Sequence, residues 1–363
     1  MKRKLLFILS LIMAVCMSIF AIGCFGEYNK GNNNYPPTSQ GLEYELSQDG
    51  TYYIVTGIGV CTDTNLVIPT IYNDLPVKEI GDYAFLNCSK LTSIVIPDSI
   101  TSIGNFVFSN CSKLTSIVIP DSVESIGRYA FLNCSKLTSI VRPDSVTSIG
   151  DWAFSSCGGL TSIVIPDSVG SIGVASFAGC NSLTKIIVDE DNAYYKSIDG
   201  NLYSKDGKTL VQYAIGKTGT TFTIPDSVEV LGDRAFADCD SLATVTIGNS
   251  VEVLGDYVFY YCSNLTSIVI PDSVTSIGEG AFACSSLTSI VIPDSVTSIG
   301  YGAFYDCDSL TSITFEDTSN WYMTTNKTDW QNKENGELTD LTNPTTNDDY
   351  FKSTYYNYYW YKK

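Results

Sequence analysis

The stretch CSKLTSIVIPDS occupies residues 88–99 and recurs unchanged at residues 111–122. A third copy, CSKLTSIVRPDS, follows at residues 134–145 and differs at one position. Each copy begins 23 residues after the previous one. No single copy carries the residues of a recognisable catalytic motif, so the function of the chain must depend on the repetition itself.

The complete repeat reads Leu-x-x-Ile-x-Ile-Pro-Asp-Ser-Val-x-x-Ile-Gly-x-x-Ala-Phe-x-x-Cys-x-x, where x varies. A period in the low twenties with apolar residues in the pattern L-x-x-I-x-I is typical of a leucine-rich repeat solenoid. One unit cannot bury its own apolar edge, but stacked units bury it by aligning identical columns. The phenylalanines that mark the units are Phe85, Phe108, Phe131, Phe154, Phe177, Phe236, Phe259, Phe282 and Phe304.

The residue types predict how one coil is built. Leu91, Ile94 and Ile96 point inward from a short strand. Pro97 ends that strand because it offers no backbone N–H to a sheet, and Asp98 begins a turn. Strands of successive coils then pair in parallel about 4.8 Å apart. We therefore expect a β-rich solenoid, a right-handed leucine-rich repeat horseshoe with a parallel β-sheet.

Two positions outside the strand carry further expectations. The far side of each coil, as at residues 107–111, is predicted to form a 3₁₀ or short helical turn after a corner glycine such as Gly104. Arg142 stands where other coils have an inward apolar residue. Because a buried lone charge is costly, we expect the Arg142 side chain to reach out to solvent.

Composition changes set the boundaries of the repeat region. Residues 80–315 form the predicted solenoid, and residues 187–223 interrupt it. The interruption contains Asp199-Gly200 and Asp206-Gly207 between apolar runs, which predicts a β-hairpin insertion.

The two ends of the repeat region need covers of their own, because a terminal coil exposes an apolar end. Residues 41–79 are expected to form an N-terminal cap, with a hairpin at Asp49-Gly50, and a first irregular repeat. Residues 316–363 are rich in Asn, Thr and aromatic residues. They form either a β cap, an aromatic ligand-binding tail that uses Tyr355, Tyr356, Tyr358, Tyr359, Trp360 and Tyr361, or a disordered end.

The N-terminus has the features of an export signal. Basic residues at positions 2–4 precede an apolar run that ends in Ala21-Ile22-Gly23-Cys24, so residues 1–23 are interpreted as a lipoprotein-type signal peptide. The small residues before the cysteine resemble a bacterial lipobox, which implies cleavage before Cys24 and lipid attachment to its thiol. Ordinary secretion and a transmembrane anchor are the alternatives. Residues 24–40, rich in Asn, Gly and Pro, are interpreted as a flexible tether.

The charge and the absence of histidine narrow the classes of function that the chain can have. The chain has a net charge of −18; without residues 1–23, which hold three basic and no acidic side chains, it has −21. Such a surface disfavours nucleic acid, whose binding depends on Lys and Arg against phosphate. The chain has no histidine, the most frequent general base and metal ligand. No nucleophile elbow occurs, so we expect no enzyme, no catalytic residues and no cofactor.

The line SIGDYAFLNCSKLTSIVIPDSV closely resembles the repeat of the BspA-like leucine-rich repeat family, with Ile-Pro-Asp-Ser, Ile-Gly, Ala-Phe and Cys in register across most of residues 42–315. The insertion YYKSIDGNLYSKDGKTLVQY and the segment GTYYIVTG also look like segments of that family. The resemblance implies a bacterial cell-surface protein involved in adhesion to extracellular-matrix proteins, host cells or other bacteria. It implies no catalytic residues.

Two polar columns run through the repeats. Cys88, Cys111, Cys134, Cys157, Cys180, Cys239, Cys262, Cys284 and Cys307 form one of them. Small buried apolar residues, disulfides and metal ligands are the alternatives, and the wide spacing without histidine argues against metal. Asp98, Asp121, Asp144, Asp167, Asp226, Asp272 and Asp294 form the other. Turn formation is the simple interpretation, and bridging calcium is the alternative.

The outward positions of the strands are the candidate partner-binding residues. They are Val95, Val118, Val141, Val164, Ile187, Val269 and Val291, flanked by Ser93, Ser116, Ser139 and Ser162. A continuous apolar row on a sheet often marks a contact surface, although valine is also simply frequent in strands.

The sequence therefore predicts a surface-anchored protein that binds an extracellular or surface protein, including matrix proteins. Its membrane contact would be the lipid at Cys24, and its location would be the bacterial cell surface or outer membrane, or the medium if the chain is secreted. A structural spacer without a dedicated ligand is one alternative. Glycan binding through the aromatic C-terminal tail is another.

Overall fold

The computed structural model describes residues 37–141, 144–332, 336–339, 341, 342, 347, 351, 352 and 356–363. Residues Thr38–Lys363 form one compact unit, a β-solenoid of about 11 turns with parallel sheets, as the repeat predicts. The signal peptide, most of the tether, Cys24, Arg142 and Tyr355 lie outside the described residues, as does the side chain of Val141. In the described part of the chain, no helix is long and apolar enough to cross a membrane.

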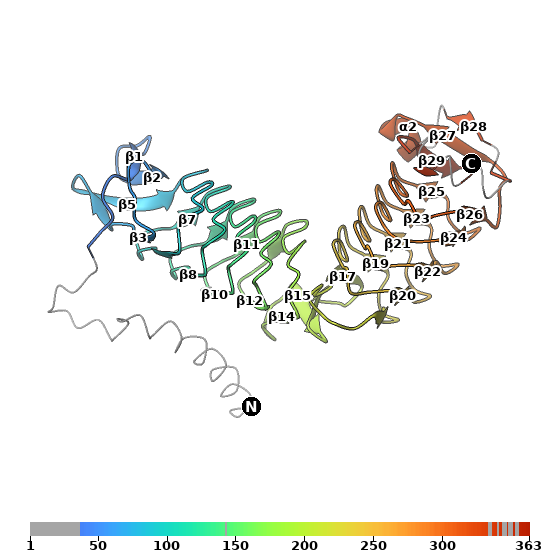
Figure 1. Cartoon of the computed structure of the whole chain (residues 1–363), viewed down its shortest axis with the longest axis horizontal. Helices are drawn as coiled ribbons and strands as arrows, with labels where there is room; N and C mark the ends of the chain where they lie inside the picture. Colours follow the sequence, from blue (N-terminus) through green and yellow to red (C-terminus); the bar gives the residue numbers. More distant parts are fainter. Residues whose placement is uncertain are drawn as a thin grey trace, which may run out of the picture. The chain divides into compact units, whose positions relative to one another are not determined.

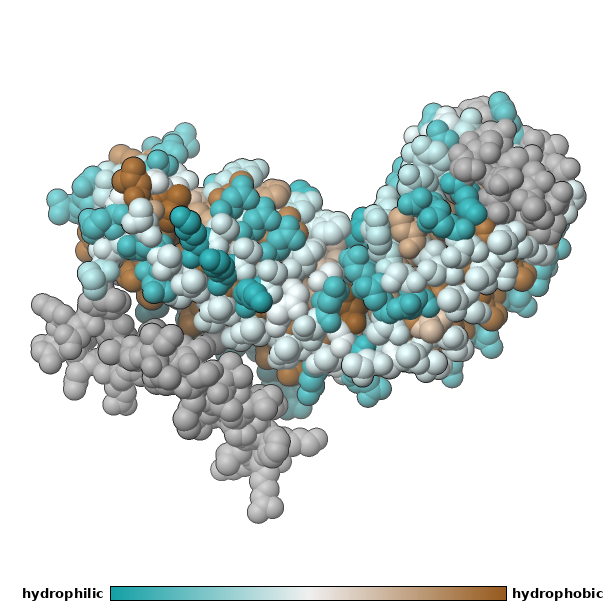
Figure 2. Space-filling model, viewed as in Figure 1, coloured by the Kyte–Doolittle hydropathy of each residue, from teal (hydrophilic) through white to brown (hydrophobic). Residues whose placement is uncertain are grey.

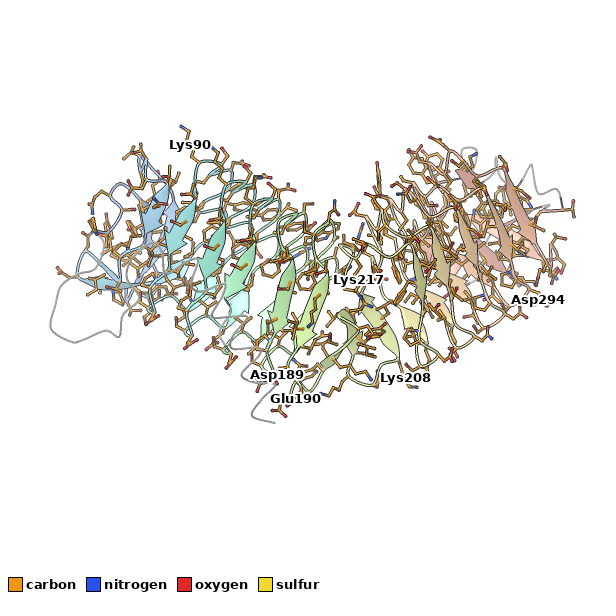
Figure 3. All side chains as sticks on the ribbon, turned by 60° about the horizontal axis from the view of Figure 1, so that its bottom comes forward. Lys90, Asp189, Glu190, Lys208, Lys217 and Asp294 are labelled. Atoms are coloured by element: carbon orange, nitrogen blue, oxygen red, sulfur yellow. The ribbon has the colours of Figure 1, made fainter. Side chains whose placement is uncertain are left out.

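One strand of each coil comes from the Ser-Ile-Val segment, and we call these strands the first strand set. Where successive coils pair, the strands are parallel and in register, with Ser116 opposite Ser139 and Ile117 opposite Ile140. Figure 3 shows the set as a row of parallel arrows. Its members are β3 (Asn65–Val67), β6 (Ser93–Val95), β8 (Ser116–Val118), β10 (Ser139–Val141), β12 (Ser162–Ile165), β14 (Lys185–Val188), β18 (Thr221–Thr223), β20 (Thr244–Thr246), β22 (Ser267–Val269), β24 (Ser289–Ile292) and β26 (Ser312–Phe315).

A second strand set, which the sequence analysis missed, comes from the Ser-Ile pair before each corner glycine. Each strand has only a few residues, often two, so its sequence carries no detectable alternation. In Figure 1 the set runs beside the first one. Its members are β5 (Leu75–Ile80), β7 (Ser102–Ile103), β9 (Ser125–Ile126), β11 (Ser148–Ile149), β13 (Ser171–Ile172), β17 (Thr209–Gln212), β19 (Val230–Leu231), β21 (Val253–Leu254), β23 (Ser276–Ile277) and β25 (Ser298–Ile299).

The third side of the coil, from the corner glycine to the cysteine, is not the predicted helical turn. The amides of Tyr129, Phe131 and Asn133 donate to carbonyls of the next coil at 2.8–2.9 Å. Between them, Leu132 N–H donates to Tyr129 C=O at 3.1 Å. Tyr129 and Asn133 take φ values of 56° and 60°, in the left-handed region. We call this side the third arc. Its ladder of backbone hydrogen bonds to the next coil holds these residues in a conformation that an isolated chain would avoid.

The core is built from columns of identical side chains. The rings of Phe85, Phe108, Phe131 and Phe154 stack in turn, with centroids 5.2–5.6 Å apart, and all are fully buried. A single coil would leave these rings in water, so burial requires the neighbouring coils. On the face shown in Figure 2, hydrophobic side chains form small separate groups among hydrophilic ones.

The cysteine column lies in this core. Cys134 and Cys157 donate their S–H groups to the carbonyls of Phe108 and Phe131 in the preceding coils, both at 3.1 Å. The described cysteines are free, without disulfides. The thiol therefore does more than fill space: it gives a buried carbonyl a second hydrogen bond.

Cys284 is an exception to the predicted column. Its coil has six residues from Phe282 through Leu287, where the other coils have seven from the phenylalanine through the leucine. The buried position is taken by Ser285, which lies against Cys307 at 3.5 Å. Cys284 instead is partly exposed, with φ 57°, at the left-handed position of the third arc.

Hairpins lie where the sequence predicts them. β1 (Glu43–Leu46) and β2 (Tyr53–Gly57) pair antiparallel around Gly50, whose φ is 71°. β15 (Tyr195–Ile198) and β16 (Asn201–Ser204) pair antiparallel around Asp199-Gly200. The insertion is part of the solenoid rather than an addition to one side, because β16 pairs with β17 and β17 pairs in parallel with β19.

The insertion also covers the strand edges that the interruption leaves open. Ile186 N–H of β14 donates to Gly200 C=O at 2.8 Å. Ile172 N–H of β13 donates to the Tyr195 hydroxyl at 3.1 Å. These bonds satisfy backbone N–H groups of β14 and β13. Elsewhere in the solenoid, the next coil provides the acceptors for the equivalent N–H groups.

The C-terminal segment forms a β cap. β29 (Tyr359–Lys362) pairs antiparallel with β25 of the last coil and with β27 (Trp321–Thr324), which also pairs with β28 (Glu337–Leu338). A short helix, α2 (Lys327–Asn332), contacts β27 and β29. Trp321, Trp360 and Tyr361 are almost completely buried, so these aromatic residues cover the apolar end.

The corner glycines allow a testable prediction about coil spacing. A Cβ at Gly150 would lie 2.6 Å from Arg128 N and 2.7 Å from Gly127 C of the preceding coil. We expect Gly150→Ala to lower the free energy of unfolding by about 1–3 kcal/mol, because the backbone must shift. Gly158→Ala is the matched control, since its Cβ would meet nothing within 4 Å. Equal urea midpoints for the two variants would contradict the close packing of the corners.

The buried thiols and phenols predict lower stability in alkali. Burial raises the pKa of Cys180 from 9.0 to about 12, that of Cys307 to about 11, and those of Tyr203 and Tyr213 from 10.0 to about 12. Above pH 9 the unfolded chain loses thiol protons that the folded chain retains. The contribution of these protonated groups to the free energy of unfolding is therefore fully present below pH 9. It falls as the pH rises towards 11–12, by up to about 1.4 kcal/mol per group per pH unit.

Urea midpoints at pH 7, 9 and 10.5 measure this effect. Cys180→Ser together with Cys307→Ser keeps two hydrogen-bond donors and should flatten the decline above pH 9. If the midpoints of the original chain are equal at pH 7 and pH 10.5, the thiols are not protected as described.

Candidate binding surface

The first strand set exposes a row of valines, as the alternation of its residues predicts. Val95, Val118, Val164 and Val291 are 40–50% exposed and Val269 is 74% exposed, whereas the preceding isoleucines, such as Ile117 and Ile163, are buried. Ile187 is half-buried. Backbone pairing places Val141 beside Val118. We call this row, with its flanking serines, the valine face.

The flanking serines lie on the same strands as the valines. Ser93, Ser116 and Ser139 are half-buried and Ser162 is exposed. Thr115 and Thr138 stand just before the strands and donate their hydroxyls to the Thr92 and Thr115 carbonyls at 3.3 and 3.1 Å. These bonds direct the threonine side chains along the solenoid, and the valine methyl groups remain the apolar part of the face.

The aspartate column borders the valine face beyond the prolines. Asp98, Asp121, Asp144 and Asp167 are exposed at the turns. The serines beside them have structural partners: Ser145 Oγ and Ser168 Oγ donate to the Val123 and Val146 carbonyls at 2.8 and 2.7 Å. Across the described residues, no group of three or more Cys, Asp or Glu side chains is placed to hold a metal ion. Turn formation explains this column, and calcium bridging stays untested.

The third arc carries two ordered rows that the sequence analysis missed. Tyr83, Phe106, Tyr129 and Trp152 stack in turn, with ring centroids 5.1, 4.4 and 6.2 Å apart. The signal was present in the sequence, since an aromatic residue stands two positions after the corner glycine in these four coils. The Arg234 guanidinium lies 4.6 Å from the Trp152 ring centroid.

The second row is a ladder of asparagines. The side-chain amide of Asn110 donates to Asn87 Oδ1 at 2.7 Å, and that of Asn133 donates to Asn110 Oδ1 at 2.9 Å. All three residues have φ values of 60–62°. Asparagine suits this position because its short polar side chain tolerates the left-handed region.

Three of the six aromatic residues of the alternative ligand-binding tail are not available to a ligand. Tyr359, Trp360 and Tyr361 are at most 8% exposed and form the centre of the C-terminal cap. Tyr356 is partly exposed and packs against Tyr305 with centroids 4.8 Å apart. The prediction of a glycan-binding tail is therefore wrong for the three buried residues.

Two hollows lie in the described part of the structure. The larger has a volume of about 400 Å³ and follows the corner between the second strand set and the third arc, over Gly127, Gly150 and Gly173. Arg128 and Asp151 form an ion pair at 3.2 Å on its rim. A smaller cavity of about 130 Å³ lies between β13 and β17. These parts of the surface can bind a partner along rows of equivalent side chains.

Comparisons with known proteins agree with this architecture. The chain matches the family described as BspA type Leucine rich repeat region, with six copies, over residues 73–205 and 214–325. A search of the curated proteins found no match.

Solved structures of bacterial proteins show the same fold. The pneumococcal vaccine antigen PcpA is similar over 78% of this chain and 67% of its own, with 26% identity and a TM-score of 0.65. A leucine-rich repeat protein of Bacteroides ovatus is similar over 78% of this chain and 72% of its own, with 28% identity and a TM-score of 0.50.

A leucine-rich cell surface protein of Faecalibacterium prausnitzii has 27% identity over 79% of this chain and 97% of its own, with a TM-score of 0.47.

The repeat columns, the parallel strand sets and the family match together lead to one conclusion. The chain belongs to the BspA-type leucine-rich repeat family.

Proposed function

We propose that this chain is a cell-surface protein that binds other proteins, including extracellular-matrix proteins and proteins of host cells or other bacteria, through the valine face. The observation that carries the proposal is the repetition of exposed valines on consecutive coils. The family supports an interaction surface as the general role.

The geometry favours an extended partner. Identical positions on successive coils lie about 4.8 Å apart, so apolar side chains form a line rather than a pocket. Stable protein interfaces bury about 1,200–2,000 Å² in total, which several coils must supply together. Burial of a valine at the interface contributes about 25 cal/mol to the free energy of binding for each Å² of apolar area removed from water. Affinity should therefore depend on the number of coils in contact.

The location belongs to the same proposal. The sequence of residues 1–24 favours export and attachment of the chain outside the cytoplasm through a lipid on Cys24. The family is consistent with an extracytoplasmic place. That the protein is not an enzyme stays a prediction, and a spacer role without a ligand is the competing outcome of the binding test.

Charge substitutions on the valine face test the proposal. Val95→Lys, Val118→Lys and Val164→Lys in one chain should lower binding to immobilised matrix proteins such as collagen and laminin at least tenfold. The lysines would place charged groups in an apolar contact from which water must be excluded. Surface plasmon resonance with the purified chain measures the loss.

A second triple variant serves as the control. Thr101→Lys, Thr147→Lys and Thr275→Lys add the same charge at exposed positions beside the second strand set. This variant should bind within about twofold of the original chain. Equal binding by both variants would reject the valine face, and no binding by the original chain to any surface protein would favour the spacer role.

A further inference from the structure

A row of three lysines stands apart from the acidic character of the chain. Lys90, Lys113 and Lys136 occupy the same position in three consecutive coils, and all three are exposed. Figure 3 shows Lys90 pointing away from the ribbon. The ion pairs found among the described residues involve other lysines and one arginine. Three ammonium groups on coils about 4.8 Å apart repel one another, so the row lacks an internal counter-charge.

The surroundings of the lysines keep their positive charge local. Residues 83–97, 106–120 and 129–143, which contain them, hold no Asp or Glu. In later coils the corresponding turn has no lysine, and two of these turns carry acidic residues instead: Asp238 and Asp240 in one, Asp306 and Asp308 in the other. The whole chain has a net charge of −18. The N-terminal coils therefore present an anion-attracting edge that the rest of the solenoid does not.

Neutral hydrogen-bonding groups run beside this edge. The ladder of Asn87, Asn110 and Asn133 lies three residues before the lysines, and the amides of Asn110 and Asn133 each use one N–H on the preceding asparagine. A second N–H of each amide remains for a ligand. Ser89 and Ser135, between the two rows, are exposed. Each of the three coils thus has an amide, a hydroxyl and an ammonium group in the same order, with the hydroxyl of Ser112 half-buried in the middle coil.

The aromatic row of the third arc points to an oxygen-rich ligand as well. Because Phe106 is stacked between Tyr83 and Tyr129, with interplanar angles of 13–14°, its edge rather than its faces meets the solvent. Ring edges carry the positive part of the aromatic quadrupole. The open face is that of Tyr83, which is 54% exposed at the first coil of the row.

We propose that Lys90, Lys113 and Lys136, together with the asparagine ladder, bind a linear anionic polysaccharide that runs along the solenoid. Its carboxylate or sulfate groups contact the ammonium groups, and its hydroxyls contact the asparagine amides and serine hydroxyls. Three identical sets of donors at equal intervals match a polymer of identical units. This site is separate from the valine face and from the aromatic tail.

Other polyanions fit less well. Double-stranded DNA carries a charge about every 1.7 Å along its axis, which does not match ammonium groups on coils about 4.8 Å apart. An acidic peptide in extended form places same-side charges about 6.6 Å apart, out of register with coils about 4.8 Å apart. Both are included as probes in the test.

The test measures binding of the purified chain to heparin, as the sulfated probe, and to alginate, as the carboxylated probe, at low ionic strength. Lys90→Gln, Lys113→Gln and Lys136→Gln in one chain should weaken binding at least tenfold and reduce its salt dependence. Replacement of the same three lysines by arginine should retain binding, because it keeps the charge.

A matched variant controls for net charge. Lys78→Gln, Lys185→Gln and Lys196→Gln remove the same three charges from other places, and binding should stay within twofold. The valine-face triple variant should also keep its polysaccharide binding. The proposal is overturned if the glutamine variant at the lysine row binds like the original chain, if neither polysaccharide binds, or if poly-glutamate or DNA binds as tightly as the polysaccharides.

Discussion

The structure depends on hydrogen bonds and stacked side chains between neighbouring coils. Backbone groups on three sides of a coil find their partners in the coils before and after, as the bond from Phe131 N–H to Ala153 C=O does at 2.8 Å. The phenylalanine rings are buried only by their equivalents. Every coil must therefore keep nearly the same path, and the period of 23 residues in most of the repeats is the sequence record of that constraint.

The same constraint determines how the molecule can bind. Because the coils follow identical paths, each outward side chain lies beside its equivalent in the next coil. A residue type that recurs at one position of the repeat therefore forms a row on the surface. Valines form such a row on the first strand set, and lysines form one at the start of the N-terminal coils. Of the two hollows described above, the one of about 400 Å³ is open along the row of corner glycines, and the other has about 130 Å³. Recognition by extended rows therefore follows from the architecture more readily than recognition in a pocket.

The sequence predicts much of the fold because apolar spacing and turn residues act locally. The inward Ile117, the outward Val118 and the hairpin at Asp199-Gly200 are all found as predicted. The second strand set escaped prediction because two residues carry no period. The third arc escaped because left-handed φ values at residues such as Tyr129 are imposed by the next coil and contradict local preference. The shift of Cys284 depends on one missing residue, which only the packing of Ser285 reveals.

Amide hydrogen exchange of the third arc tests the central claim most directly. If coils are joined by a ladder on this side, the amides of Tyr129, Phe131 and Asn133 should exchange as slowly as that of Ile117 in the first strand set. Fast exchange of these three amides, at the rate of an exposed turn, would show that the coils are not joined there and would contradict the account.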